Sequence, residues 1–285
     1  MQGKVVMVTG ATNGIGKVTA RELAKMGATL VVVGRNSQKT EATVAEIKQA
    51  CGHDRVHGML ADLSLMDDVR ALAAGFEHQF DRLDVLVNNA GVGNSQFKRT
   101  TEGFDATFAT NHLSYFLLTN LLLDVLKDSA PARIVNVASE AHRGMTLNFD
   151  DLQSEHNWGT MGFNAYGRSK LMNILFTREL AKRLEGAGVT ANVLHPGLIA
   201  TGLWSNSGPI FAFFMRIVAP LIMKSPEQGA KTTLYVASSP EVRNITGAYF
   251  DDCQQAAPSA AAQDDEAARK LWEISEEMVG LTVRV

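Results

Sequence analysis

Apolar and polar positions along this chain follow two recurring patterns. Amphipathic segments, with apolar residues every three or four positions, are expected to form helices over residues 37–50, 102–127, 165–186, 226–238 and 264–279, besides one helix after the first strand. Between these segments lie short, mainly apolar runs of the kind found in strands buried on both faces of a parallel sheet. These runs occupy residues 5–8, 30–36, 56–61, 85–87, 134–139, 189–195 and 247–250.

The strand and helix patterns alternate from one end of the chain to the other, and no internal repeat or linker interrupts them. This order predicts one α/β domain over residues 1–285, with a doubly wound parallel sheet of about seven strands flanked by helices. Residues 140–163 are polar and irregular, so we expect them to form a loop inserted over the ligand-binding edge of the sheet.

A glycine-rich loop joins the first strand to the first helix. Its sequence is Thr9-Gly10-Ala11-Thr12-Asn13-Gly14-Ile15-Gly16. A strand, a glycine loop and a helix in this order present free backbone N–H groups and the positive end of a helix dipole to a diphosphate. We expect Gly10 to permit the tight turn, Gly14 to let phosphate approach the backbone, and Gly16 to let the helix pack closely. A plain glycine turn is the alternative.

The end of the second strand bears on which dinucleotide binds. An acidic residue at this position typically binds the ribose 2′-hydroxyl of NAD, but the chain has Gly34, Arg35 and Asn36 here. An arginine suits a 2′-phosphate, which favours NADP(H) over NAD(H). The alternative is a solvated surface arginine.

Polar or small residues also follow the other predicted strands. Asp62 and Leu63 end the third strand, where the carboxylate could bind an adenine amino group, cap the next helix, or do both. The fourth strand ends in Asn88-Asn89-Ala90-Gly91, small enough to pass close to a cofactor ring, although an ordinary turn has the same composition. Ser139 and Pro196-Gly197 end the next two strands, and His195 before them is expected to be a packed strand-end histidine.

Tyr166 and Lys170 carry the candidate chemistry. Residues four apart share one face of a helix, so an ammonium lies within reach of a phenol. A positive charge about 4–6 Å away favours the phenolate and lowers its pKa. A tyrosine tuned in this way can exchange a proton with an alcohol or a carbonyl oxygen. Asn111 falls inside the predicted helix 102–127, where it pairs a freed backbone group or faces solvent.

The segment 202–224 has an unusual composition. Residues 209–223 contain a single charge, Arg216, but they are too short and too interrupted by proline to span a bilayer. We expect a lid over an apolar substrate. Peripheral membrane contact through 209–223, an oligomer contact and ordinary core packing are the alternatives.

Composition excludes several classes of function. The 285 residues are 46% hydrophobic with a formal net charge of -3, and no cluster of Lys and Arg indicates a nucleic-acid partner. Cys51 and Cys253 are far apart, which fits a reducing compartment and predicts neither a disulfide framework nor a metal site. No signal peptide is recognisable before the first strand, which predicts a cytoplasmic protein.

Taken together and in this order, the motifs resemble the short-chain dehydrogenase/reductase family along nearly the whole chain. Within that family, the chain looks most like the retinol dehydrogenase-like members. The stretches that carry this closer likeness are Gly14-Ile15-Gly16-Lys17, Asn111-His112-Leu113, residues 130–137 and residues 175–181. The resemblance implies a single-domain Rossmann fold that binds NAD(P).

The resemblance also implies roles for individual residues. Tyr166 would exchange the proton, Lys170 would lower the Tyr166 pKa and hold the nicotinamide ribose, Ser139 would bond the substrate oxygen, and Asn111 would hold a water that relays protons. The residues that would line the cofactor are Gly10, Thr12, Asn13, Gly14, Ile15, Gly16, Arg35, Asn36, Asp62, Leu63, Asn89, Ala90, Gly91, Tyr166, Lys170, Pro196, Gly197, Ile199 and Thr201.

The function expected from all of this is NADP(H)-dependent interconversion of an alcohol and an aldehyde or ketone. The substrate would be small and apolar: retinoid-, steroid- or fatty-aldehyde-like. One alternative is a regulator that senses NADP(H) without turnover, and another is a reductase of a C=C bond in a tetrapyrrole-like pigment. The family resemblance permits a homodimer or a homotetramer.

Overall fold

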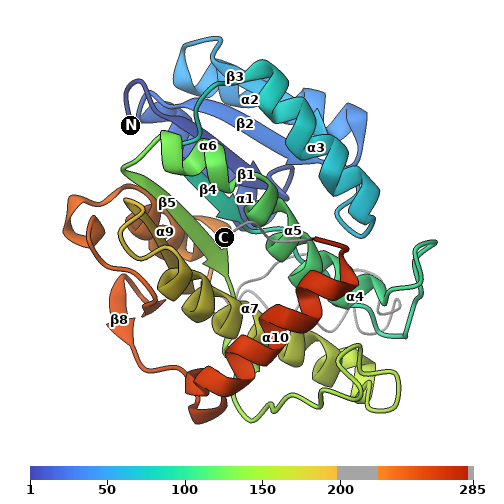
Figure 1. Cartoon of the computed structure of the whole chain (residues 1–285). Coiled ribbons are helices and arrows are strands. Elements are labelled where there is room, and N and C mark those ends of the chain that lie inside the picture. Colours follow the sequence, from blue (N-terminus) through green and yellow to red (C-terminus); the bar gives the residue numbers. More distant parts are fainter. Residues whose placement is uncertain (198–223, 282–285) are drawn as a thin grey trace.

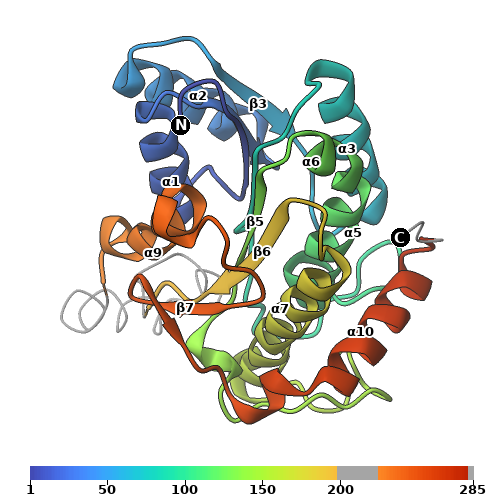
Figure 2. The same ribbon diagram turned by 60° about the vertical axis from the view of Figure 1, so that its left-hand side comes forward.

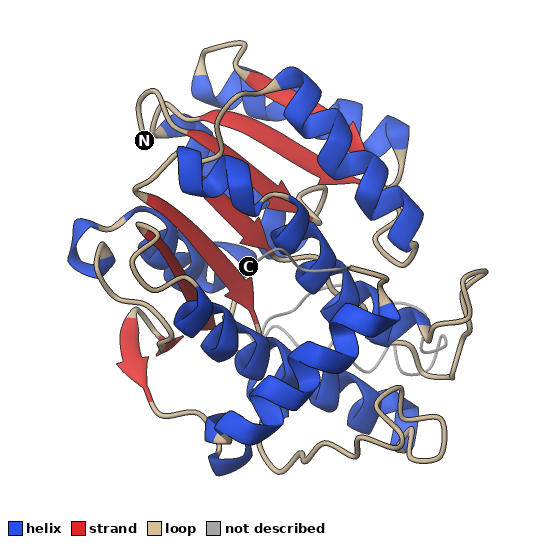
Figure 3. Cartoon of the chain, viewed as in Figure 1, coloured by secondary structure: helices blue, strands red, loops and turns tan. Residues whose placement is uncertain are grey.

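The computed structural model describes residues 1–197 and 224–281. Its centre is one eight-stranded sheet, seen in Figures 1 and 3, with the strand order β3-β2-β1-β4-β5-β6-β7-β8. All neighbouring strands are parallel except β7 and β8, which are antiparallel. The bounds are β1 Val5–Thr9, β2 Thr29–Gly34, β3 Val56–Leu60, β4 Val85–Asn88, β5 Ala132–Val137, β6 Val189–Leu194, β7 Tyr249–Asp251 and β8 Gln254–Ala256.

The sheet is doubly wound, as the sequence predicts. Chain order runs outward from β1 to β2 and β3 on one side, then returns to continue through β4, β5 and β6 on the other side. The carboxyl ends of β1 and β4 therefore meet where the strand order reverses, the place where open α/β sheets bind ligands. The sheet has one strand, β8, besides the seven that the apolar runs predict. All three residues of β8, Gln254–Ala256, are exposed, so no apolar run marks it.

Helices cover both faces of the sheet because side chains of a strand alternate between its two sides. Val6 and Val8 of β1 pack with α1 (Gly14–Lys25), α2 (Ser37–Cys51) and α9 (Pro226–Ser238). Val5 and Met7 face the larger core on the opposite side. The helices there are α3 (Met66–Gln79), α5 (Ser114–Leu121), α6 (Leu123–Asp128) and α7 (Phe163–Arg183). Figure 2 shows the two helical layers on either side of the sheet.

The predicted helix 102–127 is interrupted in the structure. It begins later, at α4 (Ala106–Phe108), because the Asp105 carboxylate accepts hydrogen bonds from the backbone N–H groups of Thr107 and Phe108. A π-turn, η1 (Ala109–Leu113), follows, and then α5 and α6. The wider π-turn contains Asn111, a position where regular α-helical spacing predicts nothing unusual.

The remaining predicted segments agree with the structure in part. Residues 140–163 form irregular chain with two short 3₁₀ turns, η2 (Glu140–His142) and η3 (Thr160–Gly162). The predicted helix 165–186 is α7, and α10 (Asp265–Met278) packs against it. The proposed lid around 202–224, the segment 209–223, Ile199 and Thr201 lie outside the described residues, except Lys224. Among the helices that are described, none is both long and apolar enough to cross a bilayer.

Candidate active site

The glycine loop and the end of β4 are locked together at the strand-order reversal. The side-chain amide of Asn89 donates to the Thr9 carbonyl at 2.9 Å, and the backbone N–H groups of Asn89 and Ala90 donate to Thr9 Oγ1 at 2.9 and 3.1 Å. Gly10 has φ +64°, and a Cβ there would lie 2.8 Å from the Ala90 Cα atom. A Cβ on Gly16 would collide with Asn89. These two glycines are therefore needed for close approach.

The first turn of α1 is free to face an anion. Asn13 precedes the helix in an extended conformation, its side chain makes no capping hydrogen bond, and no acidic residue lies in the first turn. Gly14 begins the helix with φ +51°. Backbone N–H groups at an uncapped helix start, with the positive end of the dipole behind them, are typical of phosphate sites.

At the end of β2, Arg35 is exposed and forms no ion pair with any residue that the structure describes. The neighbouring Asn36 caps α2, because its side-chain oxygen accepts from the Lys39 N–H at 2.9 Å. A Cβ on Gly34 would lie 2.5 Å from the Thr12 methyl group, so this strand end touches the glycine loop. Arg35 therefore directly follows the residue that contacts the glycine loop. Its exposed guanidinium is available to pair with an anion.

Asp62 does not cap the following helix, which corrects one of its two expected roles. Its Oδ1 atom accepts from the backbone N–H and the hydroxyl of Ser64 at 3.0 and 2.7 Å, a local turn. The helix α3 begins at Met66, and its first N–H groups donate instead to the Glu102 carboxylate. Glu102 is distant in sequence, so only the folded chain reveals this cap. The Asp62 carboxylate remains a candidate for the adenine amino group.

Tyr166, Lys170 and Ser139 converge at the carboxyl end of β5. Tyr166 and Lys170 are 9% and 3% exposed, and the Lys170 Nζ atom lies 5.7 Å from the centre of the Tyr166 ring. A side-chain hydrogen bond joins Tyr166 to Ser139. Lys170 Nζ donates to the Val137 carbonyl at 3.0 Å. A phenol, an amine and a hydroxyl therefore lie together beside the end of β5.

Burial sets the protonation of this group. Burial raises the pKa of Tyr166 to about 12, while its hydrogen bond with Ser139 acts in the opposite direction. Burial also lowers the pKa of the Lys170 ammonium to about 7, since a buried charge loses its hydration. The Tyr166 pKa is therefore raised and not lowered as expected, because desolvation is the largest influence on it.

Asn111 connects the π-turn to α7. Its amide nitrogen donates to the Val92 carbonyl and to the Ser169 hydroxyl, both at 2.9 Å, and its oxygen accepts from the Val92 N–H at 2.8 Å. The Ser169 hydroxyl in turn donates to the Tyr166 carbonyl at 2.7 Å. Gly91 lies beside this group: a Cβ there would be 3.3 Å from Lys170 Nζ.

Two supporting residues were missed by the sequence reasoning. Ser169 lies inside the Tyr166–Lys170 interval, and its contact with Asn111 spans two helices, so spacing gives no signal for it. Tyr115 donates from its hydroxyl to the Ala90 carbonyl at 2.8 Å, and Lys170 Nζ lies 5.6 Å from its ring centre. The position of Tyr115, four residues after Asn111, was the only available hint.

Comparison with known proteins agrees with this geometry. A family model described as short chain dehydrogenase matches residues 4–150. Retinol dehydrogenase 14 of Mus musculus is 43% identical over 99% of this chain and 87% of its own length. Retinol dehydrogenase 13 of Homo sapiens is 43% identical over 98% of this chain and 85% of its own. The chain belongs to the short-chain dehydrogenase family.

Solved structures place this family member among similar folds. An uncharacterized protein from Mycobacterium Paratuberculosis has 32% sequence identity and a TM-score of 0.80, covering 100% of this chain and 96% of its own. The Pseudomonas aeruginosa RhlG/NADP active-site complex has 28% identity and a TM-score of 0.69, covering 88% and 94%. The family and the retinol dehydrogenase relatives support an oxidoreductase that acts on CH–OH groups.

The turn after β6 is a further part of the candidate site of this short-chain dehydrogenase. Pro196 and Gly197 follow His195, and Gly197 has φ +88°, a conformation that favours glycine. The Gly197 N–H donates to His195 Nδ1 at 3.1 Å. Pro196 and Gly197 are therefore brought to the same edge of the sheet as Ser139, because β5 and β6 are parallel neighbours.

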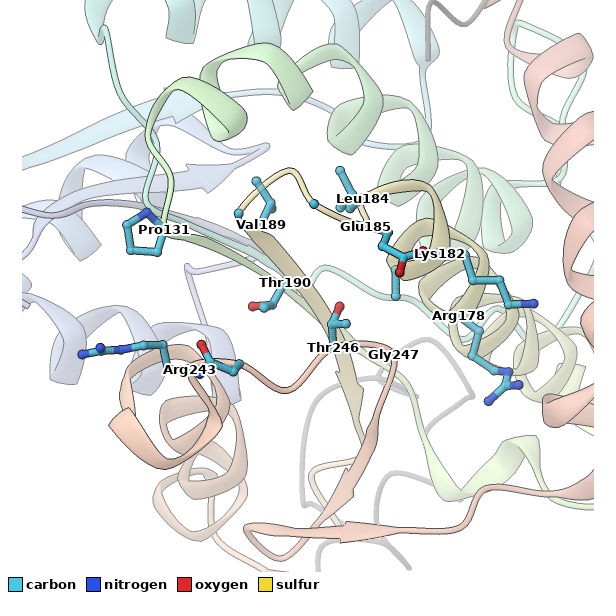
Figure 4. Close-up of a pocket in the computed structure, with 14 residues that line it drawn as sticks. Pro131, Arg178, Lys182, Leu184, Glu185, Val189, Thr190, Arg243, Thr246 and Gly247 are labelled. Atoms are coloured by element: carbon cyan, nitrogen blue, oxygen red, sulfur yellow. The ribbon is translucent and has the colours of Figure 1, made fainter.

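A surface cavity of about 640 Å³ lies at the opposite edge of the sheet (Figure 4). Its lining includes Pro131, Val189 and Thr190, which are at the amino ends of β5 and β6, and Arg178 and Lys182 of α7. None of the described residues that are candidates for catalysis or cofactor binding lines it.

Proposed function

We propose that this protein interconverts an alcohol and an aldehyde or ketone by hydride transfer, with NADP(H) as cofactor and Tyr166 as general acid and base. The observation that carries the proposal is the hydrogen bond between Tyr166 and Ser139 beside Lys170, at the sheet edge that also holds the glycine loop. This arrangement gives a proton donor and a second hydrogen-bonding group for one substrate oxygen.

The protonation of Tyr166 suits carbonyl reduction at neutral pH. With a pKa of about 12, the phenol keeps its proton and can donate it to an oxygen that gains negative charge. Ser139 would donate a hydrogen bond to the same oxygen as this charge develops. In the oxidative direction, Tyr166 has to lose its proton, and a positive charge nearby would favour that loss.

Lys170 and Asn111 would support the proton exchange of Tyr166. The Lys170 pKa of about 7 allows the amine to give and regain a proton near neutral pH. Both amide hydrogens of Asn111 are used by Val92 and Ser169, and its oxygen accepts from the Val92 N–H, so one lone pair of that oxygen is left for a relay water. Asn111 would therefore orient that water and keep the π-turn attached to α7.

The dinucleotide supplies the hydride when it is bound. Free N–H groups at the start of α1 suit its diphosphate, and Asp62 suits the adenine amino group. Arg35 would pair with a 2′-phosphate, which favours NADP(H) over NAD(H). A solved relative, the RhlG/NADP complex, is named with the same cofactor. The cofactor contacts of the other residues named in the sequence analysis stay predictions. Two of these residues, Ile199 and Thr201, lie outside the described part of the chain.

The relatives and the composition support the proposed substrate class. The two curated relatives compared above are named retinol dehydrogenases, and residues 209–223 are almost uncharged. We therefore propose a retinoid-, steroid- or fatty-aldehyde-like substrate, with residues 202–224 as its lid. Peripheral membrane contact through 209–223, assembly into a dimer or tetramer, and a cytoplasmic location stay predictions.

The test is a panel of retinoid, steroid and long-chain aldehydes or ketones, followed by loss of NADPH absorbance, with NADH in parallel. We expect turnover with NADPH, and the variant Arg35→Ala should raise the KM for NADPH by about tenfold or more while changing the KM for NADH little. Arg55→Ala, an exposed arginine on another part of the surface, is the matched control and should change neither. Binding of NADPH without turnover on any of these carbonyls would favour the regulator instead.

A further inference from the structure

His195 is an almost fully buried polar residue that has no role in the proposed mechanism. It follows β6 directly, is 7% exposed, and its backbone N–H donates to the Phe250 carbonyl at 3.1 Å. The sequence reasoning expected a histidine that merely packs at a strand end. The ring is buried as expected, and both of its nitrogens also have polar partners.

These partners fix the tautomer of the neutral ring. The Gly197 backbone N–H can only donate, so the Nδ1 atom 3.1 Å away accepts and carries no proton. The proton of a neutral imidazole is then on Nε2, and this atom lies 2.9 Å from Asp251 Oδ1. One face of the ring lies against Tyr249, with the ring planes 12° apart and the centroids separated by 6.1 Å. The orientation of the ring is therefore determined on three sides.

The hydrogen bond from the Gly197 N–H to His195 Nδ1 constrains the turn after β6. Proline has no N–H, so Gly197 supplies the first backbone donor of the turn. With φ +88°, Gly197 also has a left-handed backbone conformation that favours glycine. A Cβ on Gly197 would lie 3.0 Å from the Lys224 side chain, so the turn is packed on its other side as well. His195 Nδ1 is the acceptor that holds this donor.

The same ring reaches the turn that carries Ser139. The Glu140 Oε2 atom lies 3.5 Å from His195 Nε2 and 3.5 Å from the Tyr249 hydroxyl, which donates to it. Glu140 directly follows Ser139, whose hydroxyl accepts from the Ala141 N–H at 3.2 Å. His195 thus connects the turn after β6, the β7 strand end at Asp251 and the η2 turn beside the hydroxyl that would bond the substrate.

We propose that His195 is a positioning residue: its neutral ring holds the Pro196–Gly197 turn in place to line the dinucleotide and ties it to the η2 turn at Ser139. This inference rests on the proposed function, because it assigns Pro196 and Gly197 to cofactor binding. It does not make His195 a catalytic residue. Its role is to fix backbone groups that would contact the cofactor.

The experiment compares two variants in the binding of NADP⁺, measured by calorimetry without any substrate. His195→Phe keeps a ring against Tyr249 but cannot accept from Gly197, and we expect its dissociation constant to rise by about fivefold or more. In His195→Asn, the side-chain oxygen can accept from an N–H two residues later, so binding should return to within about twofold of the wild type. Equal binding by His195→Phe and the wild type would overturn the proposal, as would equal loss in both variants.

These outcomes separate the inference from the proposed function. A wild-type protein that binds neither NADP⁺ nor NAD⁺ would overturn both. A wild-type protein that binds and turns over NADPH, with His195→Phe behaving identically, would overturn only the inference. Thermal melting of each variant without cofactor shows whether His195→Phe has folded, and His195→Asn keeps the comparison decisive if it has not.

Discussion

At the scale of single residues, the pair Tyr166 and Lys170 shows what spacing can and cannot predict. An interval of four residues places both on one side of a helix, and the structure confirms that they are neighbours. Spacing does not reveal depth of burial. Gly167, between them, approaches the Ala141 carbonyl so closely that a Cβ would lie 2.6 Å from it, which presses α7 against η2. That packing desolvates both groups and decides their pKa values.

The buried Lys170 ammonium leads to a prediction about stability. Its pKa falls from 10.5 in the unfolded chain to about 7 in the folded one. Between these values the folded state binds fewer protons, so the stability of the wild type rises with pH across this window, and the full cost of burial applies below about pH 7. Lys170→Met should therefore raise the melting temperature without cofactor, with a gain that is largest below about pH 7 and shrinks toward pH 10.5.

Differential scanning calorimetry at several pH values measures this effect, and Lys231→Met, which replaces an exposed helical lysine, is the control. The control should show no comparable pH-dependent gain. If Lys170→Met melted lower than the wild type at every pH, the ammonium would be stabilised by its surroundings, contrary to the desolvation argument.

At the scale of elements, the C-terminal helix supports the π-turn. The His112 Nε2 atom lies 2.8 Å from the Ser275 hydroxyl of α10, and that hydroxyl donates to the Leu271 carbonyl at 2.7 Å, so the imidazole N–H donates to it. His112 is fully buried, and burial lowers its pKa to about 3. The neutral ring thus attaches α10 to the turn that contains Asn111.

Removing this attachment should destabilise the fold. Ser275→Ala leaves the buried imidazole N–H without its acceptor, which should cost about 1–3 kcal/mol in the free energy of unfolding, measured by urea titration. Ser238→Ala is a matched control because the Ser238 hydroxyl makes the same bond within its helix, to the Leu234 carbonyl at 2.7 Å, with no partner from another described element. Equal losses in the two variants would show that the contact with His112 contributes nothing.

The elements also show where sequence reasoning stops. Apolar runs predicted seven strands at nearly the right places because their burial on both faces leaves a clear pattern. The strand β8 and the π-turn left no pattern. The residues of β8 are exposed, and Asn111 of the π-turn bonds to Val92 and Ser169, which are distant in sequence. The cap of α3 by Glu102 was missed for the same reason, since the partners are far apart in sequence.

At the scale of the whole molecule, the two sides of the sheet at which the parallel strands end and begin, here the carboxyl edge and the amino edge, have different properties. The carboxyl edge holds the glycine loop, the Ser139 turn and the turn at Gly197, whereas the amino edge holds the cavity lined by Thr190. The order of motifs was enough to predict the first edge, because parallel strands bring all their carboxyl ends together. The cavity at the other edge has no sequence signature.

This division predicts that the amino edge is not needed for turnover. The Thr190 hydroxyl is buried without a hydrogen-bond partner among the residues that the structure describes, so Thr190→Val should leave kcat/KM within about twofold and the free energy of unfolding unchanged or higher. Ser139→Ala removes one hydroxyl at the opposite edge and should lower kcat by about 10²-fold. Steady-state kinetics with NADPH and the best carbonyl of the panel compares them. A large loss in Thr190→Val would assign a function to the cavity.

The central claim is that Tyr166 moves the proton in the reaction, and one comparison tests it most directly. Tyr166→Phe keeps the ring and removes only the hydroxyl, so kcat for NADPH-dependent carbonyl reduction should fall by about 10²-fold or more, while the dissociation constant for NADPH stays within about threefold of the wild type. A variant that still reduces the same carbonyl at the wild-type rate would contradict the account.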